Sequence, residues 1–276
     1  MTASLQLLLS TLLALLVPAG PASAQAPPPR LRVLTYNIHH GEGTDGKLDL
    51  PRVARVIADQ KPDLVSLQEL DVKTRRTGGV DEPAELARLT GMNFAFGKGI
   101  DYQGGQYGNA ILSRFPISST TVYPLPGKQG AEKRCALAAV VRPWRQGPAI
   151  TFVATHFDHT RDETDRLAQA AEVQRLFAEQ DAAPPTLLAG DLNAVPASET
   201  MQRLLTRWQD AGAQTNAPTV PSEKPRSRID YVLLRPPRVW HVVETTVVGE
   251  SVASDHRPVL AVLEWRGEPV IWDSQK

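Results

Sequence analysis

The feature that most constrains this chain is a recurring pattern in which apolar, strand-like runs end in acidic, amide or imidazole side chains. The sharpest example is TLLAGDLNAVP at 186–196, where residues 187–189 resemble the buried end of a strand and Gly190 breaks it. Asp191 and Asn193 follow at a spacing of two, which puts both side chains on one face if the backbone stays extended. Taken alone, this stretch would be interpreted as an ordinary strand-to-helix loop.

Four other places repeat the pattern: YNIH at 36–39, QELD at 68–71, THFD at 155–158 and SDH at 254–256. Ordinary strand ends seldom carry this much acid, amide and imidazole. Several carboxylates, two amides and two histidines at strand ends are what a hydrolytic metal site needs. The pattern therefore predicts a hydrolytic metal centre rather than a set of unrelated turns.

Length and charge narrow the possible classes. The 276 residues, 42% of them apolar, suffice for a large core and contain no internal linker, so we expect one domain and a monomer. The formal net charge is zero, which does not support a general electrostatic attraction to nucleic acid. A local basic run remains, because Lys73, Arg75 and Arg76 follow Glu69 directly. This run is either a solvated loop or a phosphate contact.

The chain begins with a segment typical of export. Residues 1–24 have no charged side chain, hold a mainly apolar run at 7–17 and end in Ala22, Ser23 and Ala24. The pattern predicts a signal peptide cleaved after Ala24 and a secreted or periplasmic protein without an integral membrane segment. Residues 25–30 are then a proline-rich tail, 31–266 the catalytic domain and 267–276 a C-terminal tail. The only cysteine, Cys135, cannot form an intrachain disulfide.

Hydrophobic periodicity predicts mixed secondary structure. We expect helices near 50–60, 82–90, 161–180 and 198–208, with Asp49 and Ser198 starting the first and last of them and Gly91 ending the second. We expect strands at 32–37, 64–68, 94–96, 108–112, 117–123, 134–141, 150–155, 186–189, 227–234, 240–248 and 258–265. The glycine-rich stretch 97–108 is interpreted as a substrate-side loop. A two-sheet sandwich with helices outside fits this order best.

Seven segments together resemble the endonuclease/exonuclease/phosphatase superfamily, in the order that the superfamily uses and over nearly the whole mature chain. They are TYNIHHG around Asn37, SLQELD around Glu69, YGNAILSR at 107–114, THFDH at 155–159, GDLN at 190–193, RIDYV at 228–232 and SDHRPV at 254–259. The resemblance implies an α+β fold of the DNase I-like type. That fold is a four-layer α/β sandwich in which two central, mainly antiparallel sheets are flanked by helices, with the active site at one edge.

The resemblance also implies roles for individual residues. Glu69 matches the principal carboxylate ligand of Mg2+ (or Mn2+), with Asn37 and Asp255 nearby, and oxygen ligands of this kind suit a hard cation. Asp191 would orient or deprotonate the attacking water, and Asn193 would help to hold it. The substrate-binding positions that the resemblance implies are Tyr107, Asn109 and Arg228.

Two histidines match donors to the phosphoryl oxygens. His156 and His256 would donate hydrogen bonds as negative charge builds, and Asp230 would orient the ring of His256. Each assignment has an ordinary structural alternative, such as a loop carboxylate or a strand-end histidine, but the set taken together favours catalysis.

Two departures limit the choice of substrate. Abasic-site endonucleases have an acid where this chain has His39, and pancreatic-type deoxyribonucleases have arginine where it has Asp71. The chain looks more like uncharacterised secreted bacterial hydrolases of the superfamily and the soluble domain of eukaryotic GPI-anchor remodelling proteins. We therefore expect a secreted metal-dependent phosphoesterase that cleaves a phosphodiester such as nucleic acid or a phospholipid headgroup. The alternatives are a phosphomonoesterase for inositol or sugar phosphates and a silent phospholigand-binding module.

Overall fold

The computed structural model describes residues 29–179, 184–268 and 270–272. The expected signal peptide at 1–24 and most of the expected tail at 25–30 lie outside the described residues. No helix among the described residues is long and apolar enough to span a membrane.

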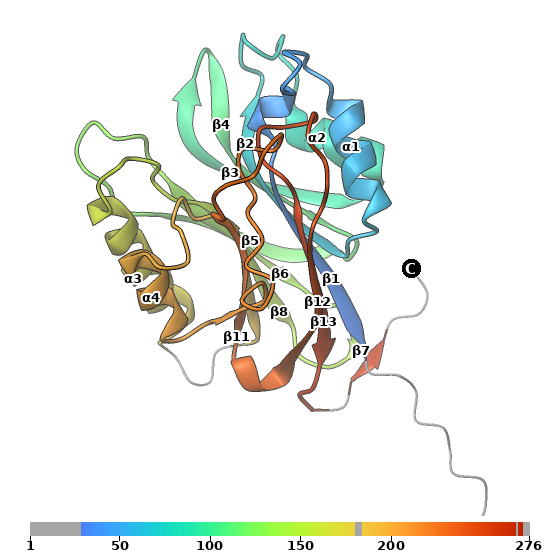
Figure 1. Ribbon diagram of the computed structural model, residues 1–276. Helices are drawn as coiled ribbons and strands as arrows, with labels where there is room; N and C mark the ends of the chain where they lie inside the picture. The colour runs from blue at the N-terminus through green and yellow to red at the C-terminus, as the bar shows by residue number, and fades with distance from the viewer. Residues whose placement is uncertain (1–28, 180–183, 269, 273–276) are drawn as a thin grey trace, which may run out of the picture.

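Two six-stranded sheets form the centre of the molecule (Figure 1). The first has the order β12 (Trp240–Val247), β13 (Val259–Trp265), β1 (Arg30–Asn37), β2 (Leu64–Val72), β4 (Gly105–Ser113) and β3 (Asn93–Tyr102). The second has the order β10 (Gln209–Asp210), β11 (Asp230–Arg235), β9 (Thr186–Asp191), β8 (Ile150–His156), β6 (Cys135–Val141) and β5 (Ile117–Pro124). Within each sheet one central pair is parallel, β1 with β2 and β8 with β9, and the other pairs are antiparallel.

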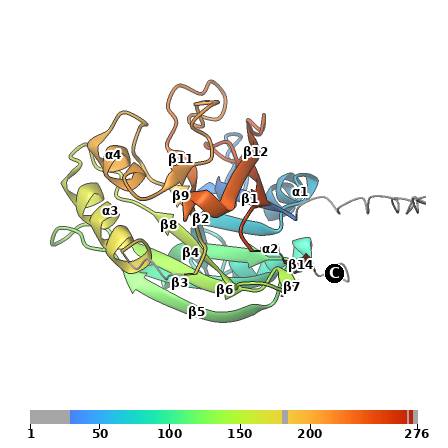
Figure 2. The same ribbon diagram turned by 90° about the horizontal axis from the view of Figure 1, so that it is seen from below.

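Helices cover the two outer faces, as Figure 2 shows. The first sheet packs against α1 (Leu50–Asp59) and α2 (Glu82–Thr90), and the second against α3 (Thr164–Phe177) and α4 (Glu199–Leu205). The helix starts follow from local chemistry, because Asp49, Asp81 and Ser198 each accept a backbone N–H of the first turn. Short 3-10 turns lie at His39–Gly41 (η1) and Pro237–Val239 (η2).

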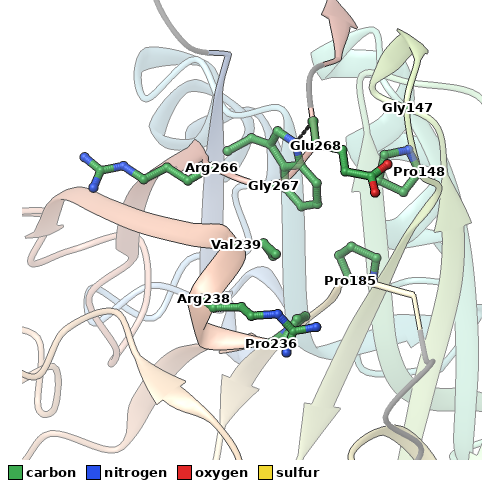
Figure 3. A pocket seen from close by; sticks show the side chains of 10 residues that line it. Gly147, Pro148, Pro185, Pro236, Arg238, Val239, Arg266, Gly267 and Glu268 are labelled. Carbon is green, nitrogen blue, oxygen red and sulfur yellow. Dashed lines mark hydrogen bonds between the residues drawn. The ribbon is translucent and has the colours of Figure 1, made fainter.

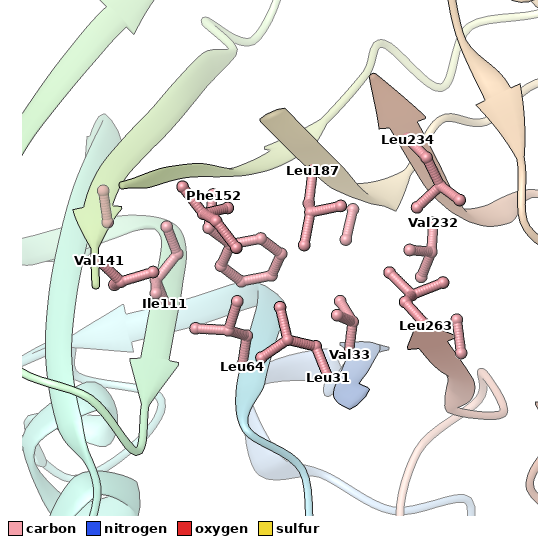
Figure 4. Packing of buried hydrophobic residues seen from close by; sticks show 14 of the residues in the cluster. Leu31, Val33, Leu64, Ile111, Val141, Phe152, Leu187, Val232, Leu234 and Leu263 are labelled. Atoms are coloured by element: carbon pink, nitrogen blue, oxygen red, sulfur yellow. The ribbon is translucent and has the colours of Figure 1, made fainter. Parts of the chain in front are cut away.

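The main core fills the space between the sheets (Figure 4). Val33 and Leu64 of the first sheet face Phe152, Leu187 and other side chains of the second, and all four are fully buried. Burying a side chain of this size contributes about 1.5–3 kcal/mol relative to exposure. Two further clusters lie beneath the helix pairs, so the order of layers is helices, sheet, sheet, helices, which confirms the predicted four-layer sandwich.

Two details of the prediction are corrected. Most of the stretch 97–108 belongs to the hairpin of β3 and β4, which turns at Gln103 and Gly104. Its glycines indicate close packing rather than a loop, since a Cβ at Gly108 would lie 2.0 Å from the Gly97 carbonyl oxygen. The expected C-terminal tail contains β14 (Ile271–Trp272), which pairs with the short strand β7 (Trp144–Gln146).

Candidate active site

The carboxyl ends of the two parallel strand pairs meet at one edge of the sandwich. Asn37, the last residue of β1, connects the two sheets there: its Nδ2 donates to Glu69 Oε1 at 2.9 Å and to Asp191 Oδ2 at 3.2 Å. Strand ends that are far apart in the sequence thus place their polar side chains around one point.

Asp191 lies at the centre of this edge and is buried, with 2% of its surface exposed. Its Oδ1 accepts the backbone N–H of Asn193, and its Oδ2 lies 3.5 Å from His156 Nε2 and 3.7 Å from His256 Nε2. Burial, followed by the nearby charge of Asp230, raises the pKa of Asp191 to about 7. A carboxylate with this pKa is suited to accept a proton near neutral pH.

His256 and Asp230 form a buried pair beside Asp191. The Nδ1 of His256 donates to Asp230 Oδ2 at 3.0 Å, which leaves Nε2 as the nitrogen facing the site. Burial lowers the pKa of His256, but the charge of Asp230 and the hydrogen bond to it, together with Asp191 and Asp255, outweigh burial and raise the pKa to about 10. His256 is therefore protonated at neutral pH and can donate to a negative oxygen.

His156 differs from His256 in its charge. Its Nε2 lies 3.1 Å from the Asn193 side-chain nitrogen, which also donates to the Phe157 carbonyl. Burial, with smaller contributions from Arg134 and His256, holds the pKa of His156 well below its ordinary value. His156 is thus a neutral ring whose Nε2 accepts from Asn193, so it positions Asn193 and does not have the expected role of donor to a phosphoryl oxygen.

Glu69, His39 and His40 lie on the opposite, more open side of Asn37. Glu69 has φ 63° at a bulge where the pairing of β2 with β4 shifts between Leu67 and Leu70. A bulge redirects a side chain out of the regular ladder, so it aims Glu69 toward Asn37. His39 and His40 follow β1 in the turn η1, with one nitrogen from each lying within 4.8 Å of a Glu69 oxygen.

The oxygen side of this cluster fits a hard divalent cation. Glu69 and Asp191 face each other across the Asn37 amide, whose NH2 group now bridges the two carboxylates. The Asn37 side-chain oxygen, which accepts the His39 N–H at 3.1 Å, and the Glu69 carboxylate are oxygen donors of the kind Mg2+ or Mn2+ prefers. Asp255 is half-buried beside His256, and its Oδ1 accepts from Ser254 at 3.3 Å.

The predicted substrate residues Tyr107 and Asn109 lie next to the site. Tyr107 and His156 border the same small hollow, and the charge of Glu69 adds to burial in raising the pKa of Tyr107. Asn109 borders that hollow too, but its amide donates to the Cys135 carbonyl at 3.2 Å and so joins β4 to β6.

A second polar hollow of about 150 Å³ adjoins Tyr107 and is lined by Arg76, Ile100, Tyr102, Tyr107 and Glu132. Arg76 stacks over the rings of Tyr102 and Tyr107, 4.8 and 5.5 Å from their centroids. Its guanidinium also forms two hydrogen bonds with the buried carboxylate of Asp71. The basic run after Glu69 therefore supplies one arginine to the wall of a hollow near the site.

Arg228 is not brought to the site. Its guanidinium pairs with Asp210, stacks 4.4 Å from the centroid of the Tyr231 ring and is 6% exposed. The pairing of β10 with β11 creates this contact, so Arg228 stabilises the second sheet instead of reaching a substrate.

Two buried serines to which the sequence patterns assigned no role hold the strand ends of the site in place. Ser66 Oγ donates to the Ala189 carbonyl of the opposite sheet at 2.8 Å and accepts from Gln68 at 2.7 Å. Ser254 Oγ donates to the Asn37 carbonyl at 2.7 Å and accepts the His256 N–H. Buried polar residues in an apolar strand were the available signal for Ser66 and Gln68.

A larger hollow lies elsewhere on the described part of the chain. Its volume is about 670 Å³, and Figure 3 shows Pro148, Pro185, Val239 and Arg266 among the lining residues. Pro148 and Pro185 precede β8 and β9, so this hollow lies at the end of those strands opposite His156 and Asp191.

The sequence and the fold were compared with those of known proteins. The chain is 27% identical over 256 residues to the uncharacterized protein YbhP of Escherichia coli K12, which covers 83% of this chain and 94% of YbhP. It superimposes on an endonuclease/exonuclease/phosphatase from Beutenbergia cavernae with a TM-score of 0.70 and 27% identity, over 87% of this chain and 72% of that one.

A mannosyl-6-phosphatase from Bacteroides thetaiotaomicron shares the fold, with a TM-score of 0.70, 18% identity and coverage of 85% of this chain and all (100%) of that one. The model of the Endonuclease/Exonuclease/phosphatase family matches residues 34–256, from the first strand to His256. The chain belongs to the endonuclease/exonuclease/phosphatase family.

Proposed function

We propose that this protein is a metal-dependent phosphoester hydrolase that cleaves a phosphodiester by in-line attack of water. The observation that carries the proposal is the position of Asp191 Oδ2, which lies between the Asn37 amide and His256 Nε2. A proton acceptor, a cation position and a charged donor thus surround one small volume. Hydrolysis at phosphorus needs these three elements together.

Asp191 and Asn193 act on the water. The water oxygen bonds to phosphorus while the bond to the leaving oxygen breaks, and the carboxylate of Asp191 takes the water proton. The leaving oxygen departs with the bonding electrons and takes a proton from solvent. Its pKa of about 7 matches this task near neutral pH. Asn193, held by His156 and the Phe157 carbonyl, orients the water beside the carboxylate.

His256 acts on the phosphoryl group. Its Nε2 lies 3.7 Å from Asp191, beyond hydrogen-bond distance, so its proton is available to a non-bridging phosphoryl oxygen. Asp230 fixes the ring through Nδ1 and keeps it charged. The donor is in place before charge develops, and this arrangement lowers the barrier more than it strengthens substrate binding.

Glu69, with Asn37 and Asp255, would hold Mg2+ or Mn2+. A bound cation of this kind supplies Lewis-acid charge to the phosphoryl oxygens.

A diester suits the charge of the site better than a monoester. Arg76 is paired with Asp71, and Arg134 lies 3.0 Å from Glu132, so neither offers an uncompensated charge. A phosphodiester has one negative charge, whereas a monoester has up to two near neutral pH. The hollow beside Tyr107 would receive a small polar substituent of the diester, and a phospholipid headgroup or a nucleotide fits that description.

The alternative is a phosphomonoesterase acting on sugar or inositol phosphates. The structural likeness to a mannosyl-6-phosphatase supports including phosphomonoesters among the substrates tested.

A substrate panel tests the proposal. Phosphodiesters, phosphomonoesters and phospholipids are assayed with Mg2+, with Mn2+ and with excess EDTA, using wild-type protein and Glu69→Ala. We expect diester hydrolysis that EDTA and Glu69→Ala both abolish. Preference for a monoester would establish the alternative, and binding without turnover would show a silent module.

We also propose that the mature protein begins at Gln25 and acts outside the cytoplasm. The apolar run at 7–17 and the small residues that close it support this proposal. Intact-mass measurement of exported protein is the test, and a mass that still includes residues 1–24 would contradict it.

A further inference from the structure

Two histidines and a carboxylate form a cluster on the open side of the site. His39, His40 and Glu69 each offer one ligand atom, and these atoms all lie within 4.8 Å of one another. None of the roles proposed for hydrolysis uses either histidine. This separates them from the buried cluster of Asp191, Asp230 and His256.

The backbone holds all three residues in an uncommon conformation. The φ angles of His39, His40 and Glu69 are 46°, 43° and 63°, in the left-handed region that residues other than glycine rarely adopt. The turn is fixed from within, because Asn37 Oδ1 accepts the His39 N–H at 3.1 Å and the Ile38 carbonyl accepts the Gly41 N–H at 2.9 Å. This backbone strain is unfavourable locally, and the conformation brings the three side chains close together.

The imidazole of His40 supplies an independent indication of a ligand. Its side chain is 9% exposed, and its Nδ1 is buried without a hydrogen-bond partner in the described structure. Leaving such a buried atom unpaired is energetically unfavourable. A cation bound at this nitrogen would remove that cost.

Glu42 contacts both histidine rings. The Glu42 carbonyl lies 3.2 Å from His39 Nδ1, and its carboxylate lies 3.5 Å from His40 Nε2. An imidazole that donates one N–H to a carbonyl or carboxylate presents its other nitrogen bare, as metal-binding histidines do. Glu42 therefore leaves Nε2 of His39 and Nδ1 of His40 as the free nitrogens.

We propose that His39, His40 and Glu69 form a second cation site, which binds a divalent transition metal in preference to Mg2+. Imidazole ligands suit Zn2+ and similar ions, whereas Mg2+ prefers oxygen. The proposal rests on the proposed function only in that Glu69 is shared with the cation held near Asn37. Its consequence is a site that holds two cations of different chemical preference, one on each side of Glu69.

Metal binding by the mature chain tests this directly. Wild type, His39→Gln, His40→Gln and the control His241→Gln, at an exposed position on β12, are dialysed against Zn2+ in excess Mg2+, and the bound metals are counted. Thermal unfolding confirms that each variant is folded. We expect one Zn2+ per chain in wild type and in the control, with affinity reduced on the order of 10- to 100-fold or more in either histidine variant.

Co2+ gives a second readout that does not depend on activity. Nitrogen ligation intensifies the visible absorption of Co2+, and this band should be lost in His39→Gln even if His40→Gln proves unstable. Equal Zn2+ binding and equal Co2+ spectra in wild type and His39→Gln would overturn the second site.

Hydrolysis assays on the same variants separate the two proposals. Unchanged metal binding in the histidine variants, with activity lost in Glu69→Ala, would remove the second site and leave the proposed function. Full activity in folded Glu69→Ala would instead remove the proposed function.

Discussion

The two sides of the active edge differ in burial and in how completely their side chains are partnered. Asp191, Asp230 and His256 are buried and contact one another across two strands and a loop. Glu69 and His39 are only half-buried and, with the buried His40, stand on a bulge and a strained turn. These contacts hold the side chains of the buried side in place, which suits proton transfer and donation to phosphate. The open side has free ligand atoms, which suits a cation that exchanges with solvent.

The largest expected effect comes from the centre of the buried side. Asp191→Asn removes the carboxylate that we propose accepts the water proton, so kcat should fall roughly 100- to 10,000-fold while the fold is retained. Steady-state kinetics on the best phosphoester, with circular dichroism to confirm folding, measures this. A folded variant with kcat close to wild type would place the base elsewhere.

Next in size is the loss of the charged donor. His256→Ala should reduce kcat on the order of 100- to 1000-fold with a much smaller change in KM. Asp230→Asn combined with His256→Ala should be little worse than His256→Ala alone, because groups that act as a unit are not additive. Fully additive losses in kcat would show that Asp230 acts independently of the His256 ring.

The difference between the two sides also explains what the sequence made predictable. The polar strand ends predicted a shared site, and Asn37, Glu69, Asp191, Asp230 and His256 do meet there, because the carboxyl ends of the parallel pairs of both sheets and the start of the antiparallel strand β11 lie at the same edge. The layers were predicted from the hydrophobic periodicity and the order of the helices and strands. The helix starts at Asp49 and Ser198 were predicted from these capping residues.

Contacts that depend on register were not predictable. The pairing of Arg228 with Asp210 requires β10 beside β11, and the pairing of Arg76 with Asp71 requires the turn after β2. The glycines of 97–108 indicated a loop, although they permit close approach of neighbouring backbone. In each case a contact formed only in the folded chain decides the role of the residue.

A stability experiment on the second sheet sharpens the contrast between catalytic and structural charges. Arg228→Met leaves Asp210 buried and unpaired, which should lower the free energy of unfolding by about 3–5 kcal/mol without changing KM. Urea unfolding measures the loss, with Arg203→Met at an exposed position of α4 as the control. A raised KM with an unchanged free energy of unfolding would instead show that Arg228 contributes to substrate binding.

The smallest expected effect on activity comes from substitution of Glu82, a buried residue that accepts the backbone N–H of Asp71. Burial, together with the charge of Asp71, raises the pKa of Glu82 to about 8, although the Asp71 N–H that it accepts acts in the opposite direction. Between pH 4.5 and about 8 the folded state keeps a proton that the unfolded state loses. The free energy of unfolding therefore falls as pH rises through that window, by at most about 1.4 kcal/mol per pH unit.

Glu82→Gln should remove this contribution and leave kcat nearly unchanged. Urea unfolding of both proteins across the window measures the difference in slope. Identical pH dependence in the two proteins would show that Glu82 is ionised in the folded state.

The central claim is that the open side holds the cation and the buried side performs the phosphoryl chemistry. Its most direct test is the dependence of kcat on Mg2+ concentration in wild type, Glu69→Gln and Asp191→Asn. We predict that Glu69→Gln raises the Mg2+ concentration needed for half-maximal rate, while Asp191→Asn lowers the maximal rate at every Mg2+ concentration. Full wild-type activity in excess EDTA, or the same change in both variants, would contradict that division.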